Sequence, residues 1–178
     1  MLGHLMKSWA LLGTAQVAVV ASATTRLIDA ELTRLDFPLT NRIVNSSPEE
    51  GMFSSIRCAA RWNGWEKGIA HWVVVLGDQP HLQPEGTLRK LVDFAGTHPD
   101  AICQPSRRGK AKHPVLLPKM VFQELANSEK KTLKDFLRSA STEVELLELE
   151  DPGLDLDIDR PADYERALQL FFSEKGIG

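Results

Sequence analysis

Hydrophobic and polar positions alternate between helical and strand spacing along the chain. Leu2, Leu5, Trp9 and Leu12 fall on one helical face, and Gly13 is a typical helix end, which predicts a helix over 2–12. The apolar run at 16–21 predicts a short buried strand. The same patterns predict further helices over 25–35, 47–61, 85–96 and 161–174, with one or two over 119–139, and further strands over 42–44, 72–76, 101–103, 114–117 and 143–149.

This order of strands and helices predicts the fold class. Strands that alternate with helices in one chain are typical of α/β proteins with a mostly parallel sheet covered by helices. A chain of 178 residues suits one such domain. We therefore expect a single domain over 1–178, a three-layer α/β sandwich with a mostly parallel sheet.

Composition excludes several classes of protein. Apolar residues make up 43% and charged residues 25%, which is an ordinary globular mixture and excludes disordered, collagenous and multi-span membrane chains. The formal net charge of −3 favours neither a nucleic acid nor a membrane as partner. Cys58 and Cys103 form no CxxC motif, so a reducing cytoplasm is favoured over a disulfide scaffold.

The first residues allow a second interpretation. Lys7 precedes an apolar run from Trp9 to Ala21, and Ala21-Ser22-Ala23 resembles a signal-peptidase site. The alternative to the helix and strand is therefore a secreted α/β protein whose signal is residues 1–23.

The clearest predicted strand ends at Gly77-Asp78-Gln79-Pro80. Ligands of open α/β sheets bind at the carboxyl ends of strands, and a carboxylate placed there suits Mg²⁺ beside substrate phosphates. Gly, Asp and Pro are also turn formers, so an ordinary turn is the alternative.

A second acidic feature is Asp155-Leu156-Asp157-Ile158-Asp159. In an extended chain its three carboxylates share one side, where a cation would relieve their repulsion. A solvated loop in which Asp159 caps the helix over 161–174 is the alternative, and both roles are compatible.

Four cations lie close together at Arg107, Arg108, Lys110 and Lys112, directly before His113-Pro114. Such a patch on an acidic chain suits phosphates, although a solvated loop explains it equally well.

Ser47-Pro48-Glu49-Glu50 has the form of a helix-capping box, followed by Gly51. Free amides at a helix start bind anions, but the capping box explains much of the same sequence.

Several common catalytic classes lack their motifs. The chain contains no G-x-S-x-G, no G-x-G-x-x-G and no G-x-x-x-x-G-K-[ST]. A serine hydrolase, a Rossmann dinucleotide enzyme and a P-loop enzyme are therefore not supported.

Taken in order, these segments resemble the MobA-like nucleotidyltransferases, and most of all the molybdenum cofactor cytidylyltransferase branch. The matching pieces span about residues 1–170. They are Asn45 with Gly51-Met52-x-x-Ser55-Ile56, the run Val73 to Pro80, His113-Pro114-Val115, and Asp157-Ile158-Asp159-Arg160-Pro161-Ala162-Asp163-Tyr164.

The resemblance implies a Mg²⁺-dependent reaction in which an acceptor phosphate attacks the α-phosphate of an NTP and pyrophosphate leaves. CTP is the favoured donor, and a phosphorylated small molecule such as molybdopterin is the favoured acceptor. A molybdoenzyme or a chaperone is a possible protein partner. Such chemistry depends on in-line positioning and charge neutralisation.

The resemblance also assigns roles to residues. It implies that Asp78 and Asp157 are the catalytic metal ligands and that Asp159 is a further ligand. Residues expected to bind nucleotide or acceptor are Asn45, Gly51, Ser55, Gly77, Gln79, Pro80 and His113, with the cations of 107–112 meeting an anionic acceptor.

Two departures from the family pattern lead to further expectations. The family's first strand and its glycine-rich loop, of the form L-A-A-G-x-S-x-R-M-G-x-x-K, have no counterpart in this sequence, so we expect the natural protein to start upstream. The alternative is a degenerate family member that binds a nucleotide or a partner protein without catalysis. Lys112 stands where the family usually has glycine, next to the expected acceptor loop.

Overall fold

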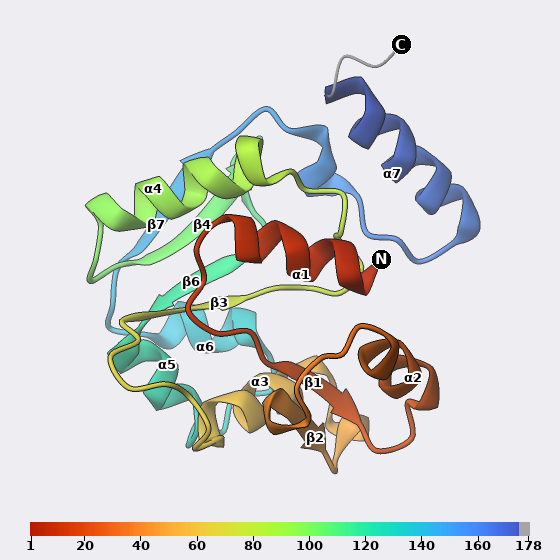
Figure 1. Ribbon diagram of the computed structural model, residues 1–178. Coiled ribbons are helices and arrows are strands. Elements are labelled where there is room, and N and C mark those ends of the chain that lie inside the picture. Colours follow the sequence, from red (N-terminus) through yellow and green to blue (C-terminus); the bar gives the residue numbers. More distant parts are fainter. Residues whose placement is uncertain (175–178) are drawn as a thin grey trace. The chain divides into compact units, whose positions relative to one another are not determined.

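The computed structural model describes residues 1–174 and divides into two units whose segments interleave along the chain. Unit 1 contains 1–14, 73–117 and the residues from Val144 onward, and unit 2 contains 15–72 and 118–143. The helices are α1 (Leu2–Leu11), α2 (Arg26–Arg34), α3 (Met52–Arg61), α4 (Arg89–Thr97), α5 (Lys119–Leu125), α6 (Leu133–Ser139) and α7 (Pro161–Glu174) (Figure 1). The strands are β1 (Val19–Ser22), β2 (Arg42–Asn45), β3 (His71–Val74), β4 (Ile102–Arg107), β5 (Lys110–Ala111), β6 (Val115–Pro118) and β7 (Val144–Glu148).

The mixed α/β class is confirmed, but the sheets differ from the predicted single, mostly parallel sheet. β1 and β2 pair in parallel as a two-stranded sheet, and a separate five-stranded sheet has the order β3-β6-β4-β5 with β7 paired to β4. β4 runs parallel to β7 but antiparallel to β5 and β6. The predicted edge strand over 143–149 is confirmed as β7. The three-layer arrangement and the single domain stay predictions.

The antiparallel pairing of β4 with β5 lies in the basic segment, where a hairpin stands in place of the solvated loop that the sequence suggested. Residues 106–111 form a β-hairpin in which Ser106 pairs with Ala111 and Arg107 with Lys110. Arg108 and Gly109 both have positive φ, 52° and 70°, as a two-residue hairpin turn of this kind requires. The tight turn sends the chain straight back along β4, so no helical crossover intervenes.

Two predicted helix starts also differ from the structure. The capping box at Ser47 does not form, because Ser47 makes no side-chain cap bond and Pro48–Glu50 is a separate single turn. α3 begins after Gly51, whose φ of 86° breaks the helical path. The predicted helix over 85–96 is interrupted at Gly86, where φ is −101° and ψ is −114°, and α4 begins at Arg89.

Unit 1 buries the N-terminal helix in one of its cores. Leu5, Trp9 and Leu12 pack with Leu82, Leu88 and Leu154. A second core joins α4 to the five-stranded sheet, and Figure 1 shows α4 beside β4 and β7. Burial of these apolar faces favours the helix-and-strand interpretation of 1–23, although the strand itself begins later than predicted, at Val19.

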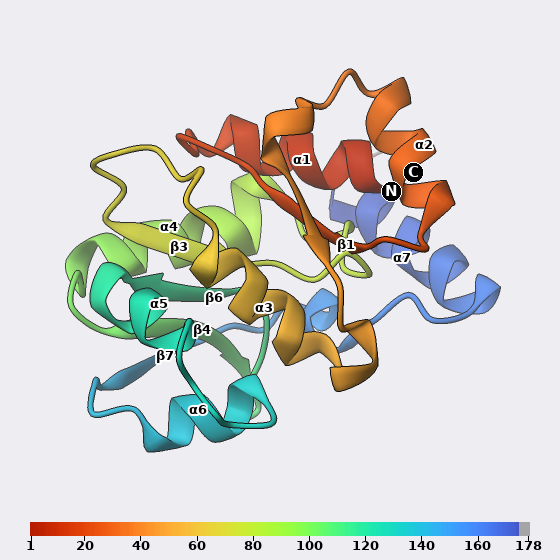
Figure 2. The same ribbon diagram turned by 90° about the horizontal axis from the view of Figure 1, so that it is seen from below.

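Unit 2 is built around α3, which contacts β1, β2 and α5 (Figure 2). Phe53 of α3 lies 6.2 Å from Phe136 of α6, measured between ring centroids. Trp72 stacks on Phe122 of α5 with centroids 4.6 Å apart. These aromatic contacts hold residues 52–72 against residues 119–139. The latter segment forms two helices, α5 and α6, within the one or two that the sequence predicted.

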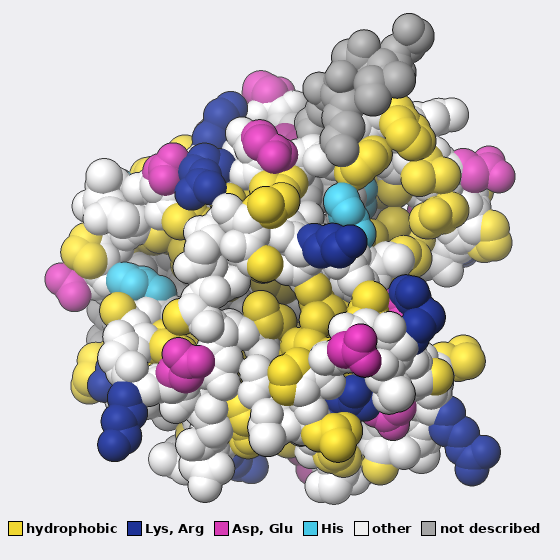
Figure 3. All heavy atoms as spheres, in the orientation of Figure 1, with side chains coloured by type: hydrophobic (Ala, Val, Ile, Leu, Met, Phe, Trp, Pro, Cys, Tyr) yellow, Lys and Arg dark blue, Asp and Glu magenta, His cyan; other side chains and the backbone are white. Residues whose placement is uncertain are grey.

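α7 begins at Pro161, as predicted, but Asp159 does not cap it. The N–H of Arg160 donates to Asp163 Oδ2 at 3.0 Å, so the first turn is closed from inside the helix. Hydrophobic side chains gather on the exposed face of α7, and Tyr164, Leu168 and Phe172 are among them (Figure 3). Within residues 1–174, no helix is long and apolar enough to cross a membrane.

Candidate functional site

Unit 1 brings two segments together at the end of β3. Gly77 is exposed, Asp78 is half-buried, and Gln79 and Pro80 are buried. The main-chain N–H of Ile158 donates to the main-chain oxygen of Asp78 at 3.0 Å. The acidic segment 155–159 therefore lies directly beside the loop that follows β3. The order of predicted helices and strands alone did not indicate this contact.

Asp157 is the acidic side chain fixed to that loop. Gln79 Nε2 donates to Asp157 Oδ1 at 2.7 Å, and the Gln79 side chain is buried. Leu156 is buried while Asp155, Asp157 and Asp159 are exposed, as expected for an extended segment with alternating faces. Gln79 thus orients an exposed carboxylate whose Oδ2 makes no hydrogen bond with another residue of 1–174.

Asp78 is held in a state that favours a cation. Its Oδ1 is buried and has no hydrogen-bond partner among residues 1–174. Burial raises the pKa of Asp78 above its ordinary value, although a hydrogen bond from its own backbone lowers it; the negative charges of Asp157 and Asp159 raise it further, and His113 acts in the opposite direction. A bound positive ion would reduce the cost of burying this oxygen without a hydrogen bond and the repulsion from the neighbouring carboxylates.

His113 lies close enough to both carboxylates for their charges to interact with it. It precedes a cis bond to Pro114, and its Nδ1 is buried without a partner among the described residues. Burial lowers the pKa of His113, while the Val74 backbone, Asp157 and Asp78 act in the opposite direction. The lowered pKa favours the neutral imidazole, whose Nδ1 can donate or accept one hydrogen bond.

These residues fit a divalent cation that is held in part by its substrate. No group of three His, Cys, Asp or Glu side chains within residues 1–174 is arranged to hold a metal alone. Mg²⁺ commonly takes only one or two protein carboxylates and completes its shell with phosphates and water. Asp78 and Asp157 fit that pattern, and Asp159 as a further ligand stays a prediction.

A further support of the acidic segment was not predicted from the sequence. His81 is buried, and its Nε2 lies 2.9 Å from the main-chain oxygen of Gly153. Asp151 accepts hydrogen bonds from the Gly153 N–H and from the Thr87 hydroxyl. His81 directly follows Gly77-Asp78-Gln79-Pro80 in the sequence, but its burial and its contact with Gly153 are visible only in the structure.

Two carboxylates hold the basic hairpin in place: Asp155, from the acidic segment already described, and Glu148, which the sequence pattern did not indicate. Asp155 pairs with Arg107 and, at 2.6 Å, with Lys112 Nζ. Glu148 accepts from the Ser106 hydroxyl at 2.6 Å and from the turn amides of Arg108 and Gly109. The hairpin therefore has a fixed place beside the acidic segment.

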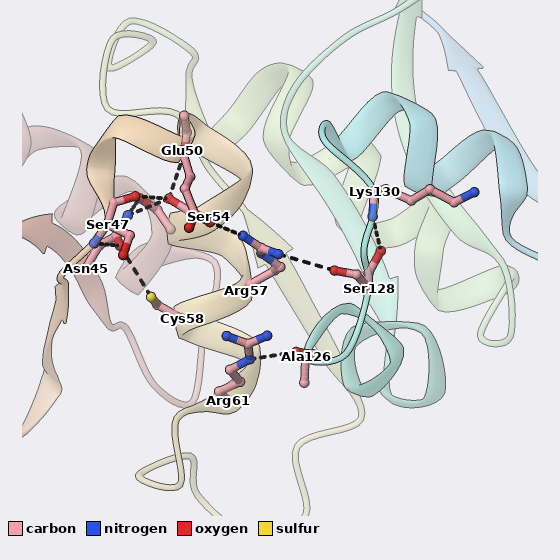
Figure 4. A network of polar contacts seen from close by, with 12 residues as sticks. Asn45, Ser47, Glu50, Ser54, Arg57, Cys58, Arg61, Ala126, Ser128 and Lys130 are labelled. Carbon is pink, nitrogen blue, oxygen red and sulfur yellow. Dashed lines mark hydrogen bonds and ion pairs between the residues drawn. The ribbon is translucent and has the colours of Figure 1, made fainter.

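The other predicted binding residues lie in unit 2. Asn45 is buried at the end of β2, and its Nδ2 donates to Ser54 and Ser55 at 2.7 and 3.0 Å (Figure 4). Its Oδ1 accepts from the Ser47 N–H at 2.9 Å and faces the Cys58 thiol. All hydrogen-bonding positions of the Asn45 amide are thus used within the unit, which makes it an organiser of the β2–α3 connection.

Gly51 is exposed at the start of α3, and Ser55 is half-buried on its first turn. The same helix carries Arg57, which pairs with Glu50 and donates to the Ser128 main-chain oxygen (Figure 4). The predicted roles of Gly51 and Ser55 in binding nucleotide or acceptor stay predictions.

Comparisons with known proteins identify the family of the chain. The family model for the MobA-like NTP transferase domain matches residues 1–145, and the chain belongs to that family. The search of curated proteins found no match.

Solved structures with the same fold include Rv0371c from Mycobacterium tuberculosis H37Rv. It is 26% identical to this chain with a TM-score of 0.70, over 94% of this chain and 82% of that one. A second structure of Rv0371c, in complex with manganese, is 26% identical with a TM-score of 0.67, over 94% and 85% of the two chains. Molybdopterin-guanine dinucleotide biosynthesis protein A from Archaeoglobus fulgidus is 17% identical with a TM-score of 0.57, over 93% and 84%, and shares the fold.

Proposed function

We propose that this protein is a divalent-cation-dependent nucleotidyltransferase. The observation that carries the proposal is Asp78, whose buried oxygen lacks a partner among residues 1–174 beside the Asp157 that Gln79 orients. Membership of the MobA-like NTP transferase family supports the reaction class. The manganese complex of Rv0371c supports a divalent metal, for which we propose Mg²⁺ as the natural ion.

The proposed reaction transfers a nucleoside monophosphate. An oxygen of the acceptor phosphate forms a bond to the α-phosphorus of the NTP, and the bond from that phosphorus to the bridging oxygen breaks, so that pyrophosphate leaves. A bound Mg²⁺ would neutralise charge on the phosphates. Asp78 and Asp157 would hold the ion, Gln79 would keep Asp157 in place, and the neutral His113 would contact the acceptor side.

We further propose CTP as donor and a molybdopterin-type phosphate as acceptor. The support is the resemblance of the four sequence segments to the cytidylyltransferase branch. Because one structural neighbour is a molybdopterin-guanine dinucleotide biosynthesis protein, GTP is the donor to test against CTP.

The test is release of pyrophosphate with Mg²⁺, molybdopterin and each NTP in turn. We expect turnover with CTP above that with GTP, and loss of turnover in Asp78→Asn. Nucleotide binding measured by calorimetry without turnover would instead favour a non-catalytic family member. Full turnover by Asp78→Asn would contradict the assignment of the site.

A further inference from the structure

Two cations of the basic hairpin converge on a single carboxylate. Arg107, at the end of β4, pairs through its Nη1 with Asp155, and Lys112 Nζ lies 2.6 Å from the other Asp155 oxygen. The side chains of Arg107 and Lys112 are 12% and 23% exposed, against 40% for Asp155. Arg108 and Lys110, by contrast, are exposed residues of the same hairpin.

The pair is incompletely satisfied by that carboxylate. Arg107 Nε is buried and has no hydrogen-bond partner among residues 1–174, although a guanidinium can offer two parallel donors to one anion. The main chain at Lys112 is rigidly placed, since its N–H donates to Pro105 and its oxygen accepts from Gln104. A fixed cation pair with an unused donor is matched better by an anion with more acceptor oxygens than by a carboxylate.

Its position connects it to the proposed reaction. Lys112 directly precedes His113, and Asp155 lies two residues before Asp157. The cation pair therefore joins the two segments that carry the imidazole and a proposed metal ligand.

We propose that Arg107 and Lys112 bind the phosphate group of the acceptor and that Asp155 is a resident anion which this phosphate displaces. The inference rests on the proposed function. It assigns the binding of the acceptor phosphate to two of the four cations of the hairpin. A phosphomonoester carries about 1.5 to 2 negative charges at pH 7 and three acceptor oxygens, so it outcompetes a single carboxylate for such a pair. The triphosphate of the NTP is a second possible source of the same chemistry, and the experiment separates the two.

The experiment measures binding of glycerol 3-phosphate, as a simple phosphomonoester, and of pyrophosphate, by titration calorimetry without NTP or metal. Asp155→Asn keeps the shape of the side chain but removes the competing charge. We expect it to tighten phosphomonoester binding about tenfold, since two partly exposed ion pairs no longer oppose the ligand. Arg107→Gln and Lys112→Gln each abolish this gain when combined with Asp155→Asn.

Lys110→Gln is the matched comparison for Lys112→Gln, because it removes the same charge two residues away. We expect it to weaken binding less than twofold. An equal effect of the two lysine variants would overturn the proposal in favour of a diffuse charge effect. Unchanged or weaker phosphomonoester binding in Asp155→Asn would overturn it as well, because Asp155 would then be only a structural partner.

A gain restricted to pyrophosphate would overturn the acceptor assignment and place the donor's phosphates at the pair. Circular dichroism melting checks that each variant is folded at the temperature of the titration. Since no transfer step is measured, the phosphate site can be confirmed even if the protein proves inactive as a nucleotidyltransferase.

Discussion

Gln79 and Asp157 are joined by a 2.7 Å hydrogen bond between side chains that lie 78 residues apart in the sequence. The Gln79 side chain is buried, so its amide cannot exchange this hydrogen bond for one with water unless the side chain moves out of the interior. The bond links the loop after β3 to the segment before α7, and with it the two carboxylates proposed to hold the metal.

Replacing Gln79 by Ala should therefore weaken metal binding. Residues that orient a metal ligand typically contribute about 10- to 100-fold to affinity, and we expect about a tenfold loss of Mn²⁺ affinity, measured by calorimetry. Gln83→Ala is the matched control, because Gln83 is equally buried but donates to the main chain of His81. Equal losses in both variants would show a general effect of destabilisation.

Gly153 lies where the chain just before the acidic segment packs tightly against His81 and Leu82. A Cβ atom there would lie 2.9 Å from Asp151 Oδ1 and 3.1 Å from the His81 ring. We expect Gly153→Ala to lower the free energy of unfolding by about 1–3 kcal/mol, as overpacking of a filled site does. Gly96→Ala, on α4 with nothing within 4 Å, should leave it unchanged or raise it by up to about 1 kcal/mol in the same urea titration. Comparable stability of Gly153→Ala and the parent would contradict the close packing.

Site residues could be predicted where their position depends only on neighbouring residues in the sequence. The apolar run that ends at Gly77 was enough to place Asp78 at a strand end, although the regular strand closes earlier, at Val74. The partners of these residues were not predictable, because they depend on pairing between distant segments. Neither the Gln79–Asp157 bond nor the contact of Asp155 with Arg107 has a signal within any short window of sequence.

The fold shows the same division. The helix and strand types were predicted from periodicity, but the antiparallel pairing of β4 with β5 was not, because Arg108, which adopts a positive φ, gives no signal of a hairpin turn. The capping box at Ser47 was wrong because the Gly51 conformation starts α3 later. Asn45 was predicted to bind ligand from the resemblance, and that role stays a prediction; the hydrogen bonds that it makes within unit 2 had no signal in the sequence.

The raised pKa of Asp78 predicts that function opposes stability at this position. A carboxyl group whose folded pKa lies above its unfolded value destabilises the fold once it ionises, so the penalty is absent at low pH and grows as the pH rises through the folded pKa. Asp78→Asn removes the charge, and we expect the melting temperature at pH 7 in a chelating buffer to rise by about 2 °C. Asp93→Asn, on the exposed surface of α4, serves as the control. A lower melting temperature for Asp78→Asn would show that the ionised carboxylate is stabilised without a metal.

Glu148 should show the opposite dependence on pH. The Ser106 hydroxyl lowers its pKa most, with help from the Gly109 and Arg108 amides and the charge of Arg107. A depressed pKa contributes stability above the unfolded value, and this contribution is lost as the pH falls through the folded one. Glu148→Gln should therefore melt below the parent at pH 7 but not at an acidic pH below the folded pKa of the carboxyl. Melting curves at the two pH values check this, and a difference that persists in acid would mean that the amide disrupts the turn by its shape.

The Asn45 side chain connects the end of β2 to α3 through several hydrogen bonds within unit 2. Its amide donates to two serine hydroxyls of α3 and accepts the Ser47 N–H; the bond to Ser54 is buried and the other two are partly buried. Truncation to Ala leaves buried polar partners unpaired, so we expect Asn45→Ala to lower the free energy of unfolding by about 2 kcal/mol in urea titration. Asn127→Ala removes the same atoms at an exposed position and should change it by less than about 0.5 kcal/mol. If the two variants were equally stable, the amide of Asn45 would be dispensable to the fold, and its place at the end of β2 would have to be explained by contact with a ligand.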